Sequence, residues 1–422
     1  MKTYYKIVAK IIILSLIFFI ACCAKPKIVV KEPVPAPPEE VKPPEVAPPP
    51  PAPLFPKVKR DTIGCVLPLS GRYADLGNKA LDAILFSAGI FDERNKTSWE
   101  VVVEDSRGLP EGVQAAIAHL ADAENVMAII AVTGTAEALE AAREADKWKV
   151  PLILITPKEG VTSVSEYVFQ HFLTPKQQIS ALVKYALNDL NCAIFSILYP
   201  KDDYGEEMVK IFREEAVRIG GKVEKAVPYS KTQTDFTQEI NKLTGSIVNP
   251  PKKVRDGKAE TKTLIPIKFE ALFIPDSYRR VRMIASQLVF YDVKGFKLLG
   301  TSLWNSPDLL KKGEEYLDGA VFADSFFTAS FYPETNDFVD AYYTAYSRDP
   351  ENIEALAYDT AGIIFRVLEN KNVQTRQDFA AGLMQVENYR GATGSISFDS
   401  NRVAQKTPFI LRVKNGKLEQ VK

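Results

Sequence analysis

The sequence predicts an α/β fold of two lobes, each built on a parallel sheet. Short apolar runs alternate with segments whose apolar residues recur at helical spacing, in two series over 62–155 and 177–299. Repeated strand–helix–strand order favours a parallel sheet covered by helices. Further helical and strand-like segments at 337–413 return to the first series. The lobes are therefore expected to be Rossmann-like and joined by several crossings.

The first series supplies the elements of lobe 1. Its predicted strands are Thr62–Leu67, Trp99–Val103, Val126–Val132 and Pro151–Ile155, with Tyr167–Phe172 following, and its predicted helices are Leu76–Phe91, Val113–Leu120 and Ala136–Trp148. Two later helices, Asp337–Tyr346 and Ile353–Leu368, complete it. We expect lobe 1 to comprise residues 58–175 plus 324–392.

The second series supplies lobe 2, expected over residues 176–323 plus 393–422. It contains a helix from Gln177 to about Leu190, strands Ala193–Leu198, Lys222–Val227, Ala271–Ile274 and Lys297–Leu299, helices Glu206–Ile219, Asp235–Leu243 and Arg280–Phe290, and closing strands Gly394–Phe398 and Phe409–Val413. Residues 245–268 interrupt the alternation with Pro250-Pro251 and many lysines. They are predicted to form an inserted surface loop.

The N-terminal segment predicts export and a lipid anchor. Three lysines precede the apolar run Ile11–Ile20, which is too short to span a bilayer and is typical of a signal peptide over residues 1–21. Phe19-Ile20-Ala21-Cys22 resembles a bacterial lipobox, in which the cysteine after a small residue is acylated. We therefore expect Cys22 to be the lipidated residue. An ordinary signal peptide with incidental cysteines is the alternative.

Residues 22–57 are predicted to be a tether between that anchor and the folded chain. Residues 24–57 hold 13 of the 28 prolines, which prevent regular helix or sheet pairing. Polyproline II extends about 3.1 Å per residue, so this segment reaches on the order of 100 Å. That reach exceeds what a domain beside a membrane protein needs.

Charge and cysteine content exclude some classes of function. The chain has 53 basic and 53 acidic residues, and loss of Lys2, Lys6 and Lys10 with the signal leaves a formal charge of −3. Without a basic patch, nucleic acid is not an expected partner. Cys65 and Cys192 lie in apolar segments of different predicted lobes, so we expect two buried free thiols and no disulfide.

Signatures of catalysis are missing. His119 and His171 are the only histidines, and neither has the spacing of a metal site. The chain has no GxSxG elbow and no Walker loop, and its carboxylate pairs are typical of solvated faces. The sequence therefore predicts no enzyme, no metal and no cofactor.

Hydroxyl residues follow three strands of the first series. Ser70 follows the first strand, Thr135 follows Val126–Val132, and Thr156 follows Pro151–Ile155. Carboxyl ends of parallel strands meet at one edge of a sheet, where hydroxyls and helix N-termini can bind a carboxylate or another anion. The alternative is that Thr135 and Thr156 merely cap helices.

The chain resembles leucine/isoleucine/valine-binding receptors of the type I periplasmic binding protein family. The resemblance rests on Ile63–Gly71 with Gly77, on Val150–Ile153, on Tyr167–Phe169, on Asp203-Tyr204-Gly205, on Asp235–Thr237 and on Gly394–Asp399. It implies the type I fold, whose two lobes are joined by a three-crossing hinge and close on a ligand.

The resemblance also implies ligand-binding residues. The family's carboxylate-binding hydroxyls match Ser70 and Thr135, with Thr156 nearby, and its ligand-facing tyrosine matches Tyr204. The family's ammonium-binding acid is absent from the loop Gly300–Trp304, so Asp276 on an adjacent strand end is the expected replacement. Ser302 and Trp304 complete the expected set, although Trp304 could instead plug the site as an apolar core residue.

Two functions stay open at this point. The first is a solute receptor that binds a small amino-acid-like or anionic ligand and serves an ABC permease. The second follows from Phe273–Ser277 and Gly300–Ser306, which also resemble lipoproteins of this fold that activate penicillin-binding proteins. That resemblance implies an outer-membrane regulator of a peptidoglycan synthase, and Cys23 in place of aspartate after Cys22 agrees with outer-membrane sorting in a Gram-negative cell.

Overall fold

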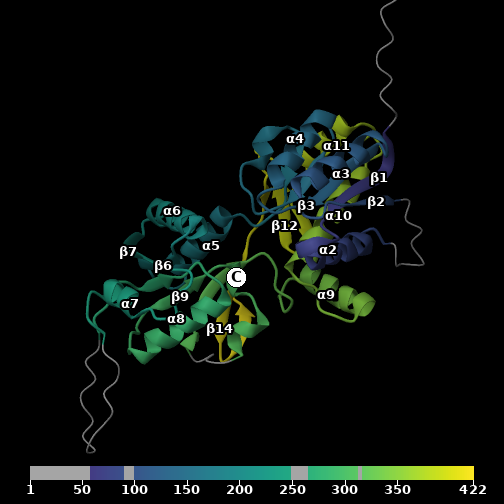
Figure 1. Cartoon of the computed structure of the whole chain (residues 1–422). Helices are drawn as coiled ribbons and strands as arrows, with labels where there is room; N and C mark the ends of the chain where they lie inside the picture. The colour runs from purple at the N-terminus through teal and green to yellow at the C-terminus, as the bar shows by residue number, and fades with distance from the viewer. Residues whose placement is uncertain (1–57, 90–98, 249–264, 312–315) are drawn as a thin grey trace, which may run out of the picture. The chain divides into compact units, whose positions relative to one another are not determined.

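A computed structural model describes residues 58–89, 99–248, 265–311 and 316–422 (Figure 1). The predicted signal peptide, Cys22, the tether and most of the predicted insertion 245–268 lie outside the described residues. In the described residues no helix is long and apolar enough to cross a membrane.

Lobe 1 is built on a five-stranded parallel sheet with the order β2-β1-β3-β4-β5. The central strand β3 is buried along its whole length, as expected of a strand covered on both faces. The strands are β1 (Lys59–Leu67), β2 (Glu100–Asp105), β3 (Val126–Val132), β4 (Leu152–Ile155) and β5 (Val168–Gln170).

Helices cover both faces of this sheet (Figure 1). One face packs against α3 (Pro110–Asp122) and α4 (Ala138–Trp148). The other packs against α2 (Ala74–Ser87) and the late helices α10 (Asn352–Leu368) and α11 (Arg376–Met384), and α9 (Pro333–Tyr346) joins the same core by packing against α2 and α10. Late helices therefore complete the core of lobe 1.

Lobe 2 is built on a seven-stranded sheet with the order β15-β14-β10-β9-β8-β6-β7. Its strands are parallel from β10 to β7, whereas β14 and β15 add antiparallel pairs. The strands are β6 (Ile194–Pro200), β7 (Lys222–Tyr229), β8 (Ala271–Phe273), β9 (Lys297–Gly300), β10 (Val321–Asp324), β14 (Phe409–Lys414) and β15 (Lys417–Gln420).

Among the described residues, four α-helices pack on the lobe 2 sheet, two in each of its cores. Helices α5 (Pro175–Asn188) and α6 (Asp203–Arg218) contribute to one core. Helices α7 (Thr237–Thr244) and α8 (Tyr278–Phe290) contribute to the other. The predicted two-lobe α/β fold is confirmed.

Some elements and one boundary differ from the expectation. The sequence pattern did not predict β10, α11, β15 or the short strands β11 (Tyr389–Gly391) and β13 (Ala404–Gln405). All residues from 393 to 422 were expected in lobe 2. In the structure, Ile396 and Phe398 on β12 (Gly394–Phe398) pack in the core of lobe 1 because that strand pairs with β11 and β13. The chain returns to lobe 2 only at β14.

The cysteines behave as predicted. Cys65 is buried in the core of lobe 1 and Cys192 in a core of lobe 2, and both are free thiols. Burial raises the pKa of the Cys65 thiol to about 12. Cys65 is therefore an inert apolar side chain.

A buried polar network lies where the chain passes between the lobes. The Lys406 ammonium donates to His171 Nε2 and to Thr393 Oγ1, each at 3.0 Å. Thr393 Oγ1 in turn donates to Asp359 at 2.6 Å. His171 Nδ1 lies 2.8 Å from Thr360 Oγ1, which donates its own proton to the Leu356 carbonyl. His171 is therefore neutral, with its proton on Nδ1.

The second passage between the lobes has its own buried acid. Asp324, at the end of β10, accepts hydrogen bonds from Asn305 and Asn352 at 2.8 and 2.9 Å. Burial raises the pKa of Asp324 to about 7, although these hydrogen bonds act to lower it. Burial lowers the pKa of Lys406 to about 8, although the negative charges of Asp359 and Asp324 act to raise it. These groups link β5, β10, α10 and the segment before β14.

Replacing His171 with asparagine should give a stability loss that depends on pH. Burial and the nearby Lys406 place the pKa of His171 well below its usual value. The unfolded chain therefore takes up a proton below about pH 6.5 that the folded chain does not, so this stabilisation is complete above pH 6.5 and declines as pH falls. We expect a loss of about 2–4 kcal/mol at pH 7.5 that shrinks by up to about 1.4 kcal/mol per pH unit below 6.5.

The measurement is urea unfolding of both chains between pH 7.5 and 5.5. His119→Asn is the control, because His119 is exposed and its Nδ1 lies 2.8 Å from Glu104 Oε1. It should cost less than about 1 kcal/mol. A wild-type advantage over His171→Asn that is constant across this pH range would contradict the neutral, buried histidine.

Candidate functional site

A hollow of about 470 Å³ lies at the carboxyl ends of the lobe 1 strands. We call it the strand-end hollow. It is lined by residues that directly follow β1, β2 and β4, by the end of β3 with the loop after it, and by the starts of α2 and α10. Ligands of open parallel sheets bind at this edge. Its lining residues are Pro68, Tyr73, Leu76, Ser106, Gly108, Val113, Val132, Thr133, Gly134, Glu137, Ile155, Pro157, Phe172, Glu351, Asn352, Ile353 and Leu356.

Two glycines bring helices close to the strand ends. A Cβ on Gly77 of α2 would lie 2.2 Å from the Pro68 carbonyl oxygen, and one on Gly112 of α3 would lie 2.1 Å from the Ser106 carbonyl oxygen. Both distances are far below any allowed contact, so only glycine fits. The first turns of α2 and α3 therefore pack directly against the loops that line the hollow.

The walls of the hollow are mainly apolar, and its charged residues are both acidic. Tyr73, Leu76 and Phe172 supply aromatic and aliphatic surface. The charged lining residues are Glu137 and Glu351, and none of the lining residues in the described chain is lysine, arginine or histidine. Thr133 and Glu137, which flank Thr135 between β3 and α4, were not among the residues expected from the sequence.

Ser70 is exposed beside the hollow and is held by Asp105. The Asp105 carboxylate accepts hydrogen bonds from the backbone N–H groups of Leu69, Ser70 and Arg107 at 2.9, 3.3 and 2.8 Å. Burial alone would raise the pKa of Asp105, but these bonds and the Ser70 hydroxyl hold it below its usual value. The loop after β1 is therefore fixed by an ionised side chain from β2.

The two expected threonines differ. Thr135 is exposed in the loop between β3 and α4, and its side chain does not cap α4. Thr156 is fully buried, with Oγ1 3.3 Å from both the Gly134 carbonyl and the Lys158 N–H. This corrects the expected ligand contact for Thr156, because its hydroxyl is used in joining the loops after β3 and β4.

In lobe 2, Tyr204 and Asp276 are close enough to interact electrostatically. Tyr204 is 36% exposed at the start of α6, and burial raises its pKa to about 12, with Asp276 contributing in the same direction. Asp276 accepts from the Tyr229 hydroxyl at 2.5 Å and from the Ser277 N–H at 2.6 Å. Asp276 is therefore held in place by neutral donors.

Ser302 and Trp304 both contact other residues of the protein. The Ser302 hydroxyl accepts from Gln178 Nε2 at 3.1 Å, and its N–H donates to Gln178 Oε1 at 3.2 Å. Trp304 is fully buried in a core of lobe 2, packed against Phe322 and over Gly300, where a Cβ would lie 2.1 Å from the indole ring. The expected ligand contact for Trp304 is corrected, because Gly300 opens the space that the ring fills.

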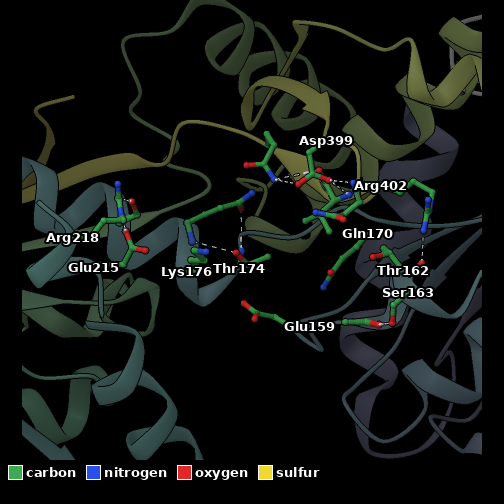
Figure 2. Close-up of a pocket in the computed structure, with 16 residues that line it drawn as sticks. Glu159, Thr162, Ser163, Gln170, Thr174, Lys176, Glu215, Arg218, Asp399 and Arg402 are labelled. Atoms are coloured by element: carbon green, nitrogen blue, oxygen red, sulfur yellow. Dashed lines mark hydrogen bonds and ion pairs between the residues drawn. The ribbon is translucent and has the colours of Figure 1, made fainter. Parts of the chain in front are cut away.

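A second, larger hollow of about 760 Å³ lies near the passages between the lobes (Figure 2). Many of its charged groups already have partners. Arg218 pairs with Glu215 at 2.6 Å, Arg402 donates to the Thr162 carbonyl at 2.7 Å, and Asp399 accepts from backbone N–H groups. Each of these charged groups therefore has a protein partner, while the Nε of Arg402 is buried without a hydrogen-bond partner in the described chain.

Comparison with known proteins identifies relatives by family and by fold. The family model described as "Periplasmic binding protein" matches residues 62–249 and 284–417. No curated protein matches the chain.

Solved structures similar to this chain are ABC transporter substrate-binding proteins for branched-chain amino acids and aromatic acids. A Rhodospirillum rubrum protein described as a branched-chain amino acid ABC transporter has 19% identity and a TM-score of 0.75, covering 85% of this chain and 99% of its own. LivJ from Streptococcus pneumoniae, in complex with isoleucine, has 22% identity, TM-score 0.62 and coverages of 86% and 99%. A Rhodopseudomonas palustris solute-binding protein in complex with 3,4-dihydroxybenzoic acid has 20% identity and a TM-score of 0.63, covering 85% of this chain and 95% of its own. At these identities the likeness shows the fold alone.

Truncating Trp304 to alanine should destabilise the protein by about 3–5 kcal/mol, because it leaves a large cavity in a packed core. Its neighbour Leu303 is 47% exposed, so Leu303→Ala should change stability by less than about 0.5 kcal/mol. Urea unfolding of both variants measures the difference. Equal and small losses of stability in the two variants would contradict a core role for Trp304 and make it again a candidate ligand contact.

Proposed function

Because this chain belongs to the periplasmic binding protein family, whose location is extracytoplasmic, we propose that it is a solute receptor. It binds a small amino-acid-like molecule between its lobes and delivers it to an ABC permease. The strand-end hollow carries this proposal. It is concave, mostly apolar and provided with a few polar groups, as small-molecule sites are.

The charge of the hollow favours an amino-acid-like ligand over an anion. None of its described lining residues carries a positive charge. A purely anionic ligand would therefore have to be held by hydrogen-bond donors alone, such as the exposed Ser70 and Thr135, whereas an amino-acid-like ligand also brings a cation. The structural neighbours named above include an isoleucine complex and an aromatic acid complex, so the fold accommodates both classes.

Lobe 2 supplies the residues that would close over the ligand. Tyr204 presents a partly exposed phenol, and Asp276 keeps a carboxylate that no lysine or arginine neutralises in the described chain. Hinge closure in two-lobe receptors brings such residues against a ligand already held by the other lobe. In this proposal Asp276 meets the ligand's ammonium group.

The N-terminal segment supports an anchored receptor in the cell envelope. Cys22 would carry the lipid, and residues 22–57 would hold the two lobes away from the membrane, the outer membrane in a Gram-negative cell. A soluble receptor needs no such anchor, and a tether that reaches on the order of 100 Å suits a partner at a distance from the anchoring membrane.

Filling the hollow should abolish ligand binding without unfolding the protein. Leu76 is 39% exposed in its wall, so Leu76→Trp adds volume there at little cost in stability. In a thermal-shift screen of amino acids and aromatic acids, at least one solute should raise the melting temperature of the full chain by about 2 °C or more at saturating concentration. Leu76→Trp should lose that shift.

Val217→Trp is the matched control, because Val217 is 69% exposed on α6 and lies outside the hollow. It should respond to the ligand like wild type. A screen in which no solute shifts the wild-type chain would count against the receptor. Retention of a peptidoglycan synthase by that same chain would support the regulatory alternative.

Changing Cys22 to alanine should release the protein from membranes. Without a thiol the lipid cannot be attached, and the described residues contain no membrane-spanning helix. Fractionation of cells fed a radiolabelled fatty acid measures both effects, with Cys23→Ala as the control that keeps label and membrane association. Equal labelling of the two variants would refute Cys22 as the anchor.

A further inference from the structure

Glu137 is a buried carboxylate without a partner in the wall of the strand-end hollow. It is only 8% exposed, and its Oε2 has no hydrogen-bond partner in the structure. Thr133, which directly follows β3 in the same loop, is equally buried, and its Oγ1 also has no hydrogen-bond partner. Leaving such groups unmatched costs free energy, most of all for a carboxylate. The wall therefore presents two acceptors ready for a donor.

The position of this carboxylate is built into the loop between β3 and α4. A Cβ on Gly134 would lie 2.8 Å from Glu137 Oε2, so the glycine leaves room for the carboxylate to fold back against the loop. Glu137 is also the N-cap residue directly before α4, and a helix N-terminus stabilises negative charge. The Glu137 carboxylate is thus held at a position where Gly134 leaves space for it and the N-terminus of α4 stabilises its charge.

No other residue of the hollow neutralises Glu137. The second acid of the lining, Glu351, is bound to Lys79 at 2.8 Å. None of the lining residues in the described part of the chain is basic. The cation that would match Glu137 must therefore come from the bound molecule.

We propose that the strand-end hollow binds a primary amine with an apolar body, with its ammonium group donating to Glu137 and Thr133. The body packs against Tyr73, Leu76 and Phe172, all in the same lining. This inference rests on the proposed receptor function and specifies its ligand. It places the cation site in lobe 1, in addition to the acid that Asp276 supplies in lobe 2. The ammonium group of an amine would then supply donors to both unpartnered acceptors of lobe 1, and no carboxylate on the ligand is needed there.

The test uses three probes with one phenyl body and different charge: 2-phenylethylamine, L-phenylalanine and 3-phenylpropionate. Calorimetric titration of the full-length chain in detergent at pH 7 should show saturable binding of the amine, at least tenfold tighter than the propionate. Glu137→Gln keeps the shape but removes the charge. It should weaken amine binding about tenfold to a hundredfold, as expected for loss of a charge-assisted hydrogen bond.

Two further variants keep the result interpretable. Glu137→Asp retains the charge and should bind the amine with intermediate affinity. Glu140→Gln lies on the same helix, where Glu140 binds Arg143 and Gln114 outside the hollow, and it should change the affinity less than twofold. All variants should melt within a few degrees of wild type, which shows that they are folded.

Other results overturn the inference. Equal amine affinity in wild type and Glu137→Gln would mean that Glu137 is matched by water and not by ligand. Binding of phenylalanine or phenylpropionate without binding of the amine would refute the cation site and leave the receptor function standing. Failure of all three probes would refute this ligand class, whereas the receptor itself fails only if the broader solute screen also fails.

Discussion

The Lys406 ammonium connects the segments on which the two-lobe arrangement depends. Burying a lysine among apolar neighbours is costly, and this one is stabilised by hydrogen bonds to His171 and Thr393 and by the negative charges of Asp359 and Asp324. Asp359 in turn accepts the backbone N–H groups of Ala392 and Thr393 at 2.7 and 2.8 Å. Removing one member leaves the others buried and unmatched, so these segments hold one geometry.

The same network shapes the strand-end hollow. Phe172 follows His171, and Leu356 accepts the hydroxyl of the Thr360 that His171 contacts. Both residues line the hollow. The wall of the hollow is therefore positioned by the polar groups that join the lobes, through β5 and α10.

Much of the fold could be predicted because periodicity is a local property. The strands Val126–Val132 and Gly394–Phe398 coincide with β3 and β12, and the helix ends on lobe 1 fall within a few residues of the expectation. The residues that were missed have weaker local signals. Val321–Asp324 is short, and its place in the sheet depends on pairing with β9 and with β14, far along the chain. Ile396 likewise lies in lobe 1 because its strand, β12, pairs there with β11 and β13.

The candidate site was predicted by region and only partly by residue. Strand-end order alone located the loops of Ser70, Thr135 and Thr156, since parallel strands end at one edge. It could not show that Thr156 is consumed in joining two loops, that Trp304 fills space opened by Gly300, or that Glu137 is left without a partner. Those outcomes depend on which atoms reach which neighbours across the fold.

The sequence by itself determined the class of fold, the two series of elements, the free buried cysteines and the edge of the sheet where a ligand site should lie. These follow from hydrophobic period, turn residues and strand order, which a chain carries locally. Only the tertiary structure decided which lobe takes 394–405, where Lys406 finds its partners, and which acid faces the hollow. Hydrogen bonds and burial join residues hundreds of positions apart, and no local pattern encodes them.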